Sequence, residues 1–576
     1  VTSPDAPART SGAVRAALLL LALAASALVS FRWCYEPDLW WHLAHGREIA
    51  AGALPRTNLF SFTHPDYPQP SISWLFDLGG WALWQAGGAT GVQLGQLVVV
   101  LATLLLLFAA CRQRAGVAAS LAVVTLGFFV LEPRALPRPH TVSFAGMAAC
   151  AYLVERAQAR RSIRPLLLAI PLVLVWSNLH VESIFGLAFL GCFALDQLLR
   201  GDDAADGGLA WRPLAVVVAC AAAVLVNPYG VGLVRYLIEN ARVPEVIRIA
   251  ELQPPYLPSY GPYFLWLFAT VALLLVPPRP RTWEVLVTGL FAALSLRYLR
   301  FTPLLVCVTA PIVAQRLAVH VGASRLLPLG ALFVALLTSR ATPSGLVRQL
   351  GVGIDALAPV EIIPRGGVAF ARRNGLGGPL FNSNNLGGYV TFALYPEARV
   401  FQDSRLQAYP PEHFRDIMTA YRSQARWNEL VAGVDWAMLS VPRANELSGA
   451  GRFPASDWAT VYFDDASEIV VRRSGHFAGL IDEHEYRVLR PGFDPFAPLP
   501  ASFAVADRLA TEVLRNRRED PDAFAPAAWL CLRGDDAESC AAAQQIAARR
   551  PELRRAALRL ARQRAASLDD VEEAAE

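Results

Sequence analysis

The stretch EPDLWWHL, residues 36–43, follows directly on an apolar run, Ala16–Phe31, that is long enough to form a first membrane helix. An acid, two tryptophans and a histidine thus lie close together where a membrane–water boundary is expected. If this stretch is helical, Asp38 and His42 share a face at a spacing of four residues, while Trp40 and Trp41 turn toward the interface. An ionisable pair held at a bilayer surface by aromatic side chains predicts a functional site.

The composition predicts an integral membrane protein. Of the 576 residues, 54% are hydrophobic and only 17% are charged, whereas about a quarter of the residues of a soluble protein are charged. The formal net charge of +4 is small for this length and argues against a nucleic-acid partner. The lipid bilayer is the expected partner of most of the chain.

Residues 1–340 alternate apolar runs with short polar links, which predicts a polytopic α-helical membrane domain of about eleven spans. Several of the runs are shorter than the roughly 20 residues of a full span. The expected spans are Ala16–Phe31, Gly91–Ala110, Ala115–Leu131, Val142–Val154, Leu166–Leu179, Ile184–Leu199, Leu214–Val226, Tyr263–Val276, Trp283–Leu296, Pro303–Leu317 and Leu326–Leu337.

The arginines assign the links to the two sides of the membrane. The links with Arg112 and Arg114, with the cluster from Arg156 to Arg164, and with Arg279 and Arg281 alternate along the chain, so they are expected to be cytoplasmic. The external links are then residues 34–90, 132–141, 180–182, 227–262 and 297–300, and they include every link rich in Trp, His, Pro and Asn. With an odd number of spans the C-terminal half lies outside; if Leu326–Leu337 does not span, it lies inside.

From about residue 341, short β-rich runs alternate with helical ones, which predicts a small extracytoplasmic α/β domain over residues 341–475. A Pro-rich linker, 476–500, and a helical tail, 501–576, follow. Cys531 and Cys540 could form a disulfide if the tail is extracytoplasmic, although their spacing also fits one helix. The expected strands are Pro379–Phe381, Arg399–Gln402, Trp436–Val441 and Ser467–Val471, the expected helices are Val360–Asn374, Trp427–Ala432, Ala504–Asn516 and Ala541–Ala565, and Asn384–Gly388 is expected to be a turn.

Several of these links resemble those of a bacterial family of polytopic membrane proteins in the GT-C superfamily of glycosyltransferases. The resemblance covers about residues 15–475. The matching features are DLWWHL at 38–43 with Gly46, PRTNLFSFT at 55–63, Trp74, RPH at 138–140, WSNLH at 176–180, NPYG at 227–230, RYLRFTP at 297–303, GGY at 387–389 and DSR at 403–405.

The resemblance implies a transferase similar to the protein O-mannosyltransferases and the aminoarabinose transferase of lipid A. Such enzymes move a sugar from a polyprenyl-phosphate-linked donor to an acceptor on the outer membrane face. An acidic residue early in the first external loop is catalytic in that superfamily, and Asp38 occupies this position. Those relatives often have adjacent acids, whereas Pro37 separates Glu36 from Asp38 here. A divalent metal cofactor is therefore not supported by an adjacent-acid motif, and no metal ligands are assigned.

The acids and aromatic residues of the first external link have two interpretations each. Asp38 would be the general base that deprotonates an acceptor hydroxyl, or else a helix N-cap. His42 could orient Asp38, bind sugar hydroxyls or ligate a metal, or else pack beside Trp41. Trp41 and Trp74 could stack on a sugar ring or prenyl tail, or else anchor the interface. Asp77, on the helix of Trp74, is the candidate second acid.

The external arginines are candidates to bind the donor phosphate. A lipid phosphate needs a cation at the bilayer edge, and an arginine fork binds it bidentately. Arg138, with its neighbour His140, and Arg300 are favoured, followed by Arg297; contacts with lipid headgroups are the alternative.

His180 and Glu182 lie at the outer end of an expected span. They could contact the donor or stabilise the leaving phosphate, or else form a satisfied polar patch. Asp66, in the proline-rich HPDYPQP stretch, is expected to be a turn residue.

The sequence thus favours a GT-C-type glycosyltransferase of the bacterial cytoplasmic membrane that acts on a cell-envelope acceptor. The second interpretation is a membrane scaffold or assembly protein that keeps the fold without turnover. A lipid or solute transporter ranks last, because it would carry acids and helix breaks at mid-membrane, and the expected spans are nearly free of charge.

Overall fold

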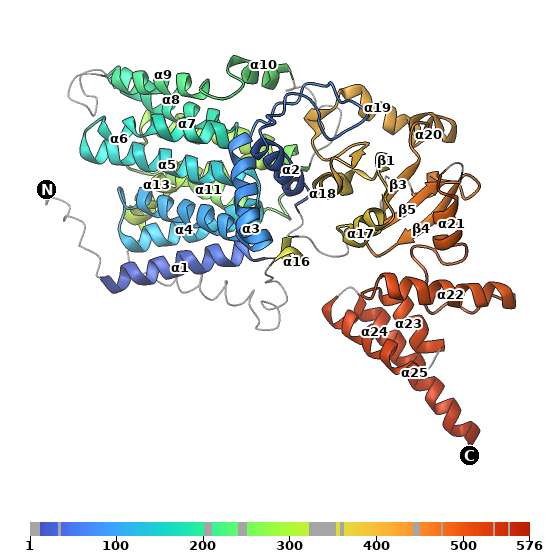
Figure 1. Ribbon diagram of the computed structural model, residues 1–576. Helices are drawn as coiled ribbons and strands as arrows, with labels where there is room; N and C mark the ends of the chain where they lie inside the picture. Colours follow the sequence, from blue (N-terminus) through green and yellow to red (C-terminus); the bar gives the residue numbers. More distant parts are fainter. Residues whose placement is uncertain are drawn as a thin grey trace. The chain divides into compact units, whose positions relative to one another are not determined.

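The computed structural model describes residues 12–32, 36–200, 210–239, 250–321, 353–357, 362–441, 450–473, 476–533, 536–550 and 553–575. The chain forms two compact units (Figure 1). The first consists of Val1–Thr57 and Tyr67–Ala358, and the second of Asn58–Asp66 and Pro359–Glu576. A short piece of the link 34–90, which the sequence predicted to be external, therefore belongs to the second unit.

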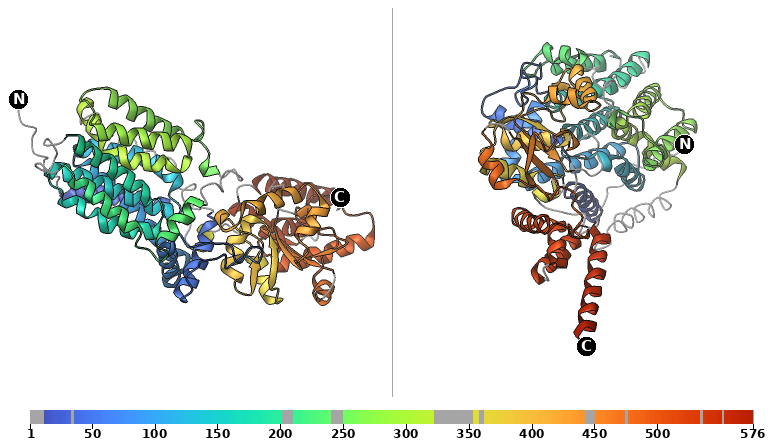
Figure 2. Two further views of the ribbon diagram at one scale, coloured as in Figure 1. Left: turned by 90° about the horizontal axis from the view of Figure 1, so that it is seen from above. Right: turned by 90° about the vertical axis from the view of Figure 1, so that its right-hand side faces the viewer.

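The first unit is a bundle of helices (Figure 2). Its core is apolar and joins α3, α4, α5, α8, α11, α12 and α13, with Trp176, Trp266 and Trp283 buried in it. The elements are α1 Gly12–Ser30, α2 Asp38–Ala50, α3 Trp74–Cys111, α4 Val117–Leu131, η1 Glu132–Arg134, α5 Pro139–Arg160, α6 Arg164–Leu167, α7 Ala169–Leu179, α8 Ser183–Arg200, α9 Arg212–Val224, α10 Val231–Glu239, η4 Ala250–Leu252, α11 Gly261–Leu275, α12 Thr282–Arg297, η5 Leu299–Phe301, α13 Thr302–His320 and α16 Ile354–Leu357.

The bundle is apolar outside as well as inside. Val218 on α9 and Leu265, Phe268 and Leu275 on α11 are each more than 60% exposed. Large apolar side chains this exposed on several helices are typical of a surface that meets lipid rather than water. The first unit is thus a helical membrane domain.

The predicted spans from Ala16–Phe31 to Pro303–Leu317 all fall on described helices. Among the described residues, four segments are long and apolar enough to cross a membrane, namely Trp74–Cys111, Val117–Arg134, Ser183–Arg200 and Leu299–His320. Leu20–Ser30, Arg164–Leu179, Arg212–Val224 and Gly261–Leu275 are shorter apolar helices. The count of eleven is not confirmed, and Leu326–Leu337 lies outside the described residues.

Helices α2 and α3 pack very closely, and this contact positions the candidate site. A Cβ on Gly46 of α2 would lie 2.0 Å from the backbone oxygen of Asp77 on α3, so only glycine fits there. Helix α3 has non-helical angles at Gly87 and Gly88, and Gly88 has a φ of +57° that favours glycine. The kink separates the segment that faces α2 from the long apolar segment after it.

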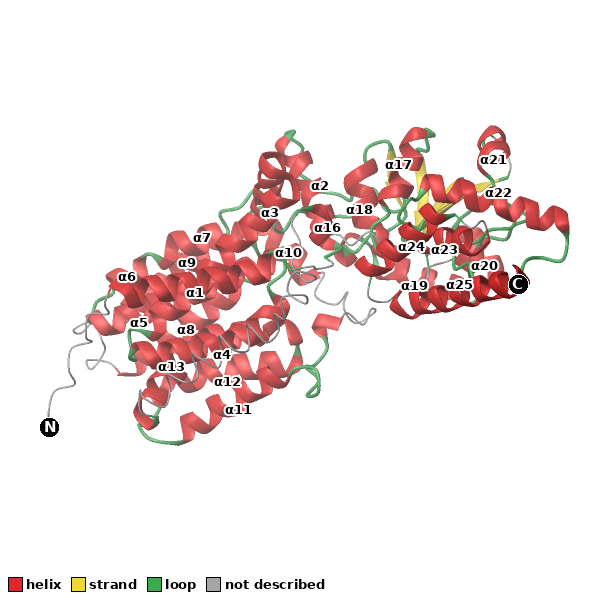
Figure 3. Ribbon diagram, turned by 90° about the horizontal axis from the view of Figure 1, so that it is seen from below, coloured by secondary structure: helices red, strands yellow, loops and turns green. Residues whose placement is uncertain are grey.

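The second unit contains a five-stranded sheet, as the sequence predicted in outline (Figure 3). The strand order is β2-β1-β3-β5-β4; β1 is parallel to β2 and β3, and β5 is antiparallel to β3 and β4. The strands are β1 Gly378–Asn382, β2 Ala398–Val400, β3 Trp436–Ser440, β4 Trp458–Phe463 and β5 Ser467–Arg472, and the helices are α17 Arg365–Arg373, α18 Asn384–Leu394, η6 Leu406–Ala408, α19 Pro411–Ala420, α20 Gln424–Leu430, η8 Ala450–Arg452 and α21 Ala478–His484.

Alternate side chains of the strands enter two separate apolar cores. Leu380, Met438 and Ile469 face one core with α17, α18 and α21, while Phe381 and Leu439 face another that contains Ile417 of α19 and Trp427 of α20. The sheet is therefore covered by helices on both faces, which explains why its strands are apolar on both sides.

Two local predictions in this half were wrong, and one strand was missed. Asn384–Gly388 is the first turn of α18, where Gly387 allows the helix to approach the backbone of Gln402; a Cβ there would lie 2.3 Å from its oxygen. Ala541–Ala565 is two helices, because the proline at position 551 cannot continue a helix. Strand β4 was not predicted, since WATVYF is buried throughout and lacks the alternation that marks a half-exposed strand.

Residues 58–66 extend the sheet beyond its edge strand β2, and we call them the strap. The backbone N–H of Val400 donates to the carbonyl of Phe60 at 3.0 Å, and that of Phe62 donates to the carbonyl of Val400 at 3.2 Å. Ser61 pairs with Val400 in a parallel bridge. The chain on either side of the strap is joined at Thr57 and Pro68 within the first unit.

The helical tail consists of α22 Phe503–Glu519, α23 Phe524–Arg533, α24 Ala537–Arg549 and α25 Arg554–Ala575. A disulfide joins Cys531 of α23 to Cys540 of α24, so the two cysteines do not share one helix. Apolar side chains of α23, α24 and α25 pack around this disulfide.

Candidate functional site

Asp38 lies at the start of α2, against the guanidinium of Arg138. Helix α2 begins at Asp38 with Pro37 as its N-cap residue, so the N-cap interpretation of Asp38 is wrong. Its carboxylate Oδ2 instead accepts a hydrogen bond from Arg138 Nη2, and its backbone N–H donates to Glu36 Oε1 at 3.1 Å. A guanidinium and a helix N-terminus both interact favourably with a negative charge at this position.

Three carboxylates share Arg138. Its Nε lies 3.4 Å from Glu36 Oε1, and its Nη1 lies 3.4 Å from Glu251 Oε2. Glu251, in η4, also pairs with Arg134 Nη2 at 2.6 Å and lies 4.0 Å from Arg300 Nη1. These residues come from links far apart in the sequence, and Glu251 joins them.

Arg300 continues the ion pairs to the link after α7. Its Nε and Nη2 donate to Glu182 Oε1 at 3.1 and 2.8 Å. The other oxygen of Glu182 lies 3.5 Å from His180 Nδ1, which is also 2.7 Å from the hydroxyl of Ser143. We refer to seven of these residues as the ionic network: Glu36, Asp38, Arg134, Arg138, Glu182, Glu251 and Arg300.

Burial and neighbouring charges shift the pKa values of Glu36, Glu251 and His180 in different directions. Burial raises the pKa of Glu36 to about 7, although the charge of Arg138 opposes this. Burial also acts to raise the pKa of Glu251, but the neighbouring arginines outweigh it and hold that pKa well below its ordinary value. Burial lowers the pKa of His180 to about 4 against the opposing charge of Glu182. Glu36 is thus a carboxyl that changes protonation near neutral pH, as acid–base groups do.

His42 contacts Asp77 rather than Asp38. Its Nδ1 lies 2.6 Å from Asp77 Oδ1, and its ring lies against that of Trp41 at a tilt of 30°, with centroids 3.6 Å apart. The hydroxyls of Ser71 and Ser73 donate to the two oxygens of Asp77 at 2.5 and 3.1 Å. Asp77 is completely buried, so it positions this cluster and is not open to substrate.

The His42 cluster adjoins the ionic network. The positive charges of His42, Arg138 and Arg300 all act to lower the pKa of His180. With the ion pairs above, this brings five of the predicted residues into one region: Asp38, His42, Arg138, His180 and Arg300.

The remaining predicted residues lie around this region or have structural contacts. The Trp74 indole N–H donates to Asn178 Oδ1 at 2.7 Å, which ties α3 to α7. His140 Nε2 lies 2.6 Å from the carbonyl of Arg134, which closes the loop before α5. Arg297 is exposed over the ring of Tyr298 at 4.7 Å, and no hydrogen bond or ion pair joins it to the ionic network in the part of the chain described.

Sequence reasoning missed the residues that hold the site together. Glu251 lies in the link 227–262, well after its NPYG motif, and no sequence signal indicated its central place. Glu36 was seen only as a non-adjacent acid. His45 was also missed; its Nδ1 lies 3.5 Å from Asp77 Oδ2, and its spacing of three residues from His42 could have indicated a shared helix face.

Within the described ranges, no group of three or more His, Cys, Asp or Glu side chains is arranged to hold a metal ion. Each acid of the ionic network is paired with at least one arginine.

Comparison with known proteins gives only distant likenesses. No family model and no curated protein matches the sequence. Among solved structures, the oligosaccharyltransferase AglB from Archaeoglobus fulgidus, in complex with an inhibitory peptide and a dolichol-phosphate, matches with a TM-score of 0.49 and 10% identity over 74% of this chain and 70% of its own. ArnT from Cupriavidus metallidurans, bound to undecaprenyl phosphate, matches with a TM-score of 0.47 and 15% identity over 80% of this chain and 98% of its own. Likenesses with TM-scores below 0.5 and identities of 15% or less do not assign a family or an activity to the chain.

Proposed function

We propose that the chain is a membrane glycosyltransferase that takes a sugar from a polyprenyl-phosphate-linked donor and passes it to a hydroxyl of a cell-envelope acceptor on the outer face of the cytoplasmic membrane. One observation carries the proposal: the carboxylate of Asp38 and the guanidiniums of Arg138 and Arg300 belong to one continuous network. All of the links that contribute to it are those that the arginine distribution predicted to be external.

In this proposal Asp38 removes the proton of the acceptor hydroxyl as its oxygen attacks the anomeric carbon. The bond from that carbon to the phosphate oxygen breaks, and polyprenyl phosphate leaves with one more negative charge. Arg138 holds the Asp38 carboxylate in place, and a cation near the phosphate stabilises the leaving group.

Arg300 is better placed than Arg138 to be that cation. All three nitrogens of Arg138 face carboxylates at 3.4 Å or less. Arg300 uses Nε and Nη2 for Glu182, but its Nη1 is 4.0 Å from its nearest carboxylate, and its side chain is 26% exposed. Nη1 of Arg300 therefore has N–H donors available for a phosphate.

Replacing Asp38 by Asn tests the proposed reaction. The substitution keeps the size of the side chain and removes its basicity, so we expect transfer to fall by about 100-fold or more. The assay follows release of undecaprenyl phosphate from a panel of undecaprenyl-phosphate sugars, with the full-length protein in nanodiscs and envelope extracts as acceptors. Asp66→Asn is the matched control, because Asp66 is an exposed acid of the same link. Full turnover by a folded Asp38→Asn protein would refute the proposal.

Replacing Arg300 by Gln should weaken binding of undecaprenyl phosphate by about 10-fold, the loss expected for one charge-assisted hydrogen bond. Native mass spectrometry of the protein with added undecaprenyl phosphate would measure this. Arg235→Gln, on the exposed face of α10, is the control for loss of one positive charge. If the Arg300 and Arg235 variants bind undecaprenyl phosphate with equal affinity, Arg300 does not bind the phosphate.

A non-catalytic scaffold is the second candidate, and one observation favours it. Each arginine of the ionic network is paired with at least one acid, as in a polar cluster that only holds loops together. A scaffold predicts that Asp38→Asn lowers the melting temperature and leaves no catalytic difference to detect, because the wild type itself does not turn over any lipid-linked sugar.

We also propose that the C-terminal half lies outside the cytoplasm. The disulfide between Cys531 and Cys540 supports this side, because disulfides persist in oxidising compartments and are rare in the cytosol.

A further inference from the structure

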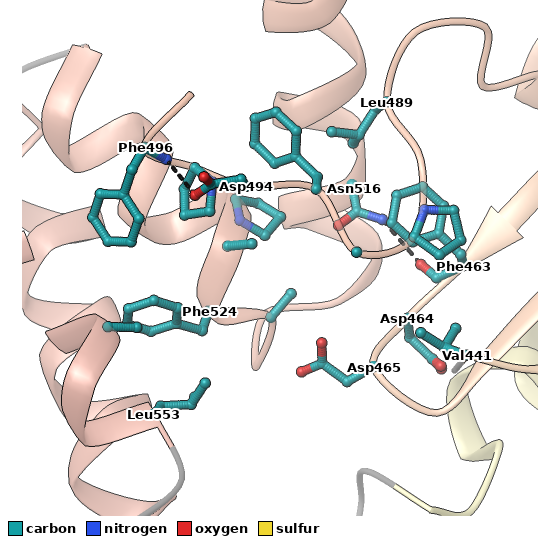
Figure 4. A pocket seen from close by; sticks show the side chains of 18 of the residues that line it. Val441, Phe463, Asp464, Asp465, Leu489, Asp494, Phe496, Asn516, Phe524 and Leu553 are labelled. Atoms are coloured by element: carbon teal, nitrogen blue, oxygen red, sulfur yellow. Dashed lines mark hydrogen bonds between the residues drawn. The ribbon is translucent and has the colours of Figure 1, made fainter. Parts of the chain in front are cut away.

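The second unit contains a cavity of about 620 Å³ (Figure 4). It lies at the end of β4, the edge strand opposite β2. Its walls come from the turn after β4, residues 463–465, the Pro-rich segment 489–496, Asn516 of α22, the start of α23 and the first turns of α25. This volume is within the range of about 300–1,000 Å³ that is typical of ligand sites.

The cavity is mostly apolar. Figure 4 shows the rings of Phe496 and Phe524 on one side of it, with Leu553 below them and Leu489 on the opposite side. Further rings and prolines complete the walls, namely Phe463, Phe493, Pro491, Pro495 and Pro526. Such a surface binds apolar side chains by removing them from water.

Most of the charged groups at the cavity are already paired. Asp464 accepts hydrogen bonds from the Tyr462 hydroxyl at 2.9 Å and from the backbone N–H groups of the turn that follows. Asp465 forms an ion pair with Arg550 at 2.5 Å. Asp494 lies 4.0 Å from Arg559, whose guanidinium also covers the Phe496 ring.

Two polar side chains at the cavity can still form a hydrogen bond or an ion pair with a ligand. Asn516 is 1% exposed; its Nδ2 donates to the carbonyl of Phe463 at 2.9 Å, and no described residue donates to its Oδ1, which lies among the cavity-lining side chains in Figure 4. Arg555, at the rim, makes no hydrogen bond or ion pair with the described part of the chain. A buried acceptor and a free cation thus lie at one apolar cavity.

We infer that this cavity binds an extended peptide segment that carries an apolar side chain next to a carboxylate. The apolar side chain fits among the phenylalanines and prolines, a backbone N–H of the peptide donates to Asn516 Oδ1, and the carboxylate pairs with Arg555. The site lies in the second unit and does not depend on the proposed transferase reaction.

A saccharide fits these walls less well. Each of its hydroxyls would need a partner, and the paired state of Asp464, Asp465 and Asp494 leaves few. Unpartnered hydroxyls in an apolar cavity lose binding free energy. A fatty acid would satisfy the cation and the apolar walls but has no N–H for the buried oxygen of Asn516.

Selection of peptides against the full-length protein in nanodiscs tests the inference. We expect a random seven-residue display library to yield peptides with an acidic residue beside an apolar one, and fluorescence polarisation of the synthesised peptides to give a dissociation constant. Arg555→Glu should raise that constant by about 10-fold or more, because it reverses the charge at the rim. Arg554→Glu is the matched control, since Arg554 is exposed, adjacent in sequence and not part of the lining.

A second variant tests the apolar part of the cavity independently. Ala525→Trp places a large ring on the wall and should abolish binding, while non-reducing peptide mapping checks that the Cys531–Cys540 disulfide, and hence the tail, is intact. The inference fails if no peptide is enriched over empty nanodiscs. It also fails if Arg554→Glu and Arg555→Glu have equal effects, or if a saccharide panel binds in a way that Ala525→Trp blocks while peptides do not.

Discussion

Replacing Arg405 by Ala is expected to lower the free energy of unfolding of the second unit by about 3–5 kcal/mol, the typical cost of removing one partner of a buried ion pair. Arg405 and Asp403 are both fully buried. Arg405 Nε and Nη2 donate to the two oxygens of Asp403 at 2.9 and 2.6 Å. Without the guanidinium, the Asp403 carboxylate keeps a buried charge that the Tyr409 hydroxyl, at 3.2 Å, and the backbone N–H of residue 405, at 2.9 Å, compensate only in part.

The same side chain also holds the strap. Arg405 Nη2 donates to Asn58 Oδ1 at 2.9 Å, and its guanidinium lies 4.8 Å from the centre of the Phe60 ring. Loss of Arg405 should therefore release residues 58–66 from β2 as well as weaken the sheet. Asn58→Ala, which removes one hydrogen bond to Arg405, should release the strap at a smaller cost of about 1–2 kcal/mol.

Hydrogen exchange of the intact protein in nanodiscs would measure both effects, through the backbone N–H groups of Phe62, Val400 and β1. Arg415→Ala is the matched control, because Arg415 is exposed and pairs only with exposed Glu412. Unchanged protection of these groups in Arg405→Ala would show that the buried pair does not stabilise this part of the sheet.

The sequence indicated the broad architecture because burial follows simple periodicities. Long apolar runs predicted the helices of the first unit, and short β-rich runs predicted four of the strands. Strand β4 and the first turn of α18 were not predicted, because the contacts that determine them involve residues elsewhere in the chain. The close approach of Gly387 to Gln402 cannot be read from an Asn-Asn-Leu-Gly-Gly stretch alone.

Some residues of the candidate site could be predicted from the sequence, but Glu251 and the pairing of the charged groups could not. Asp38, His42, Arg138, His180 and Arg300 stood out because charged residues are rare beside apolar runs. Which acid pairs with which arginine or histidine depends on how α2 packs against α3 and on where η4 lies. Neither feature has a sequence signature. Residues 58–66 illustrate the same limit, since a link of the membrane domain completes the sheet of the other unit.

Lowering the pH from 7.5 to 5 is expected to weaken the second unit through the histidines at the strap. His413 Nδ1 lies 3.1 Å from His64 Nε2, and its ring stacks on Tyr409 with centroids 4.8 Å apart. Burial lowers the pKa of His413 to about 3, with the charge of His64 adding to this and Asp403 opposing it. Burial also lowers the pKa of His64, against the charge of Asp416.

Because the pKa of His413 is lowered on folding, acid lowers the stability of the second unit. An unfolded histidine binds a proton near pH 6.5, whereas folded His413 stays neutral until about pH 3, so the unfolded state binds more protons between these values. The stability that His413 contributes is complete above about pH 6.5 and is lost as the pH falls, by about 2 kcal/mol at pH 5. Protonation of both rings would also place two cations in direct contact.

His413→Phe should flatten this pH dependence, because it keeps a ring beside Tyr409 and removes the titrating group. The measurement is hydrogen exchange of β2 and the strap at pH 7.5 and 5, corrected for the intrinsic exchange rate at each pH. His476→Phe, at an exposed position, is the matched control and should retain the wild-type slope. A slope unchanged in His413→Phe would mean that the acid sensitivity arises from other groups, and the paired histidines would then be only a packing contact between the strap and α19.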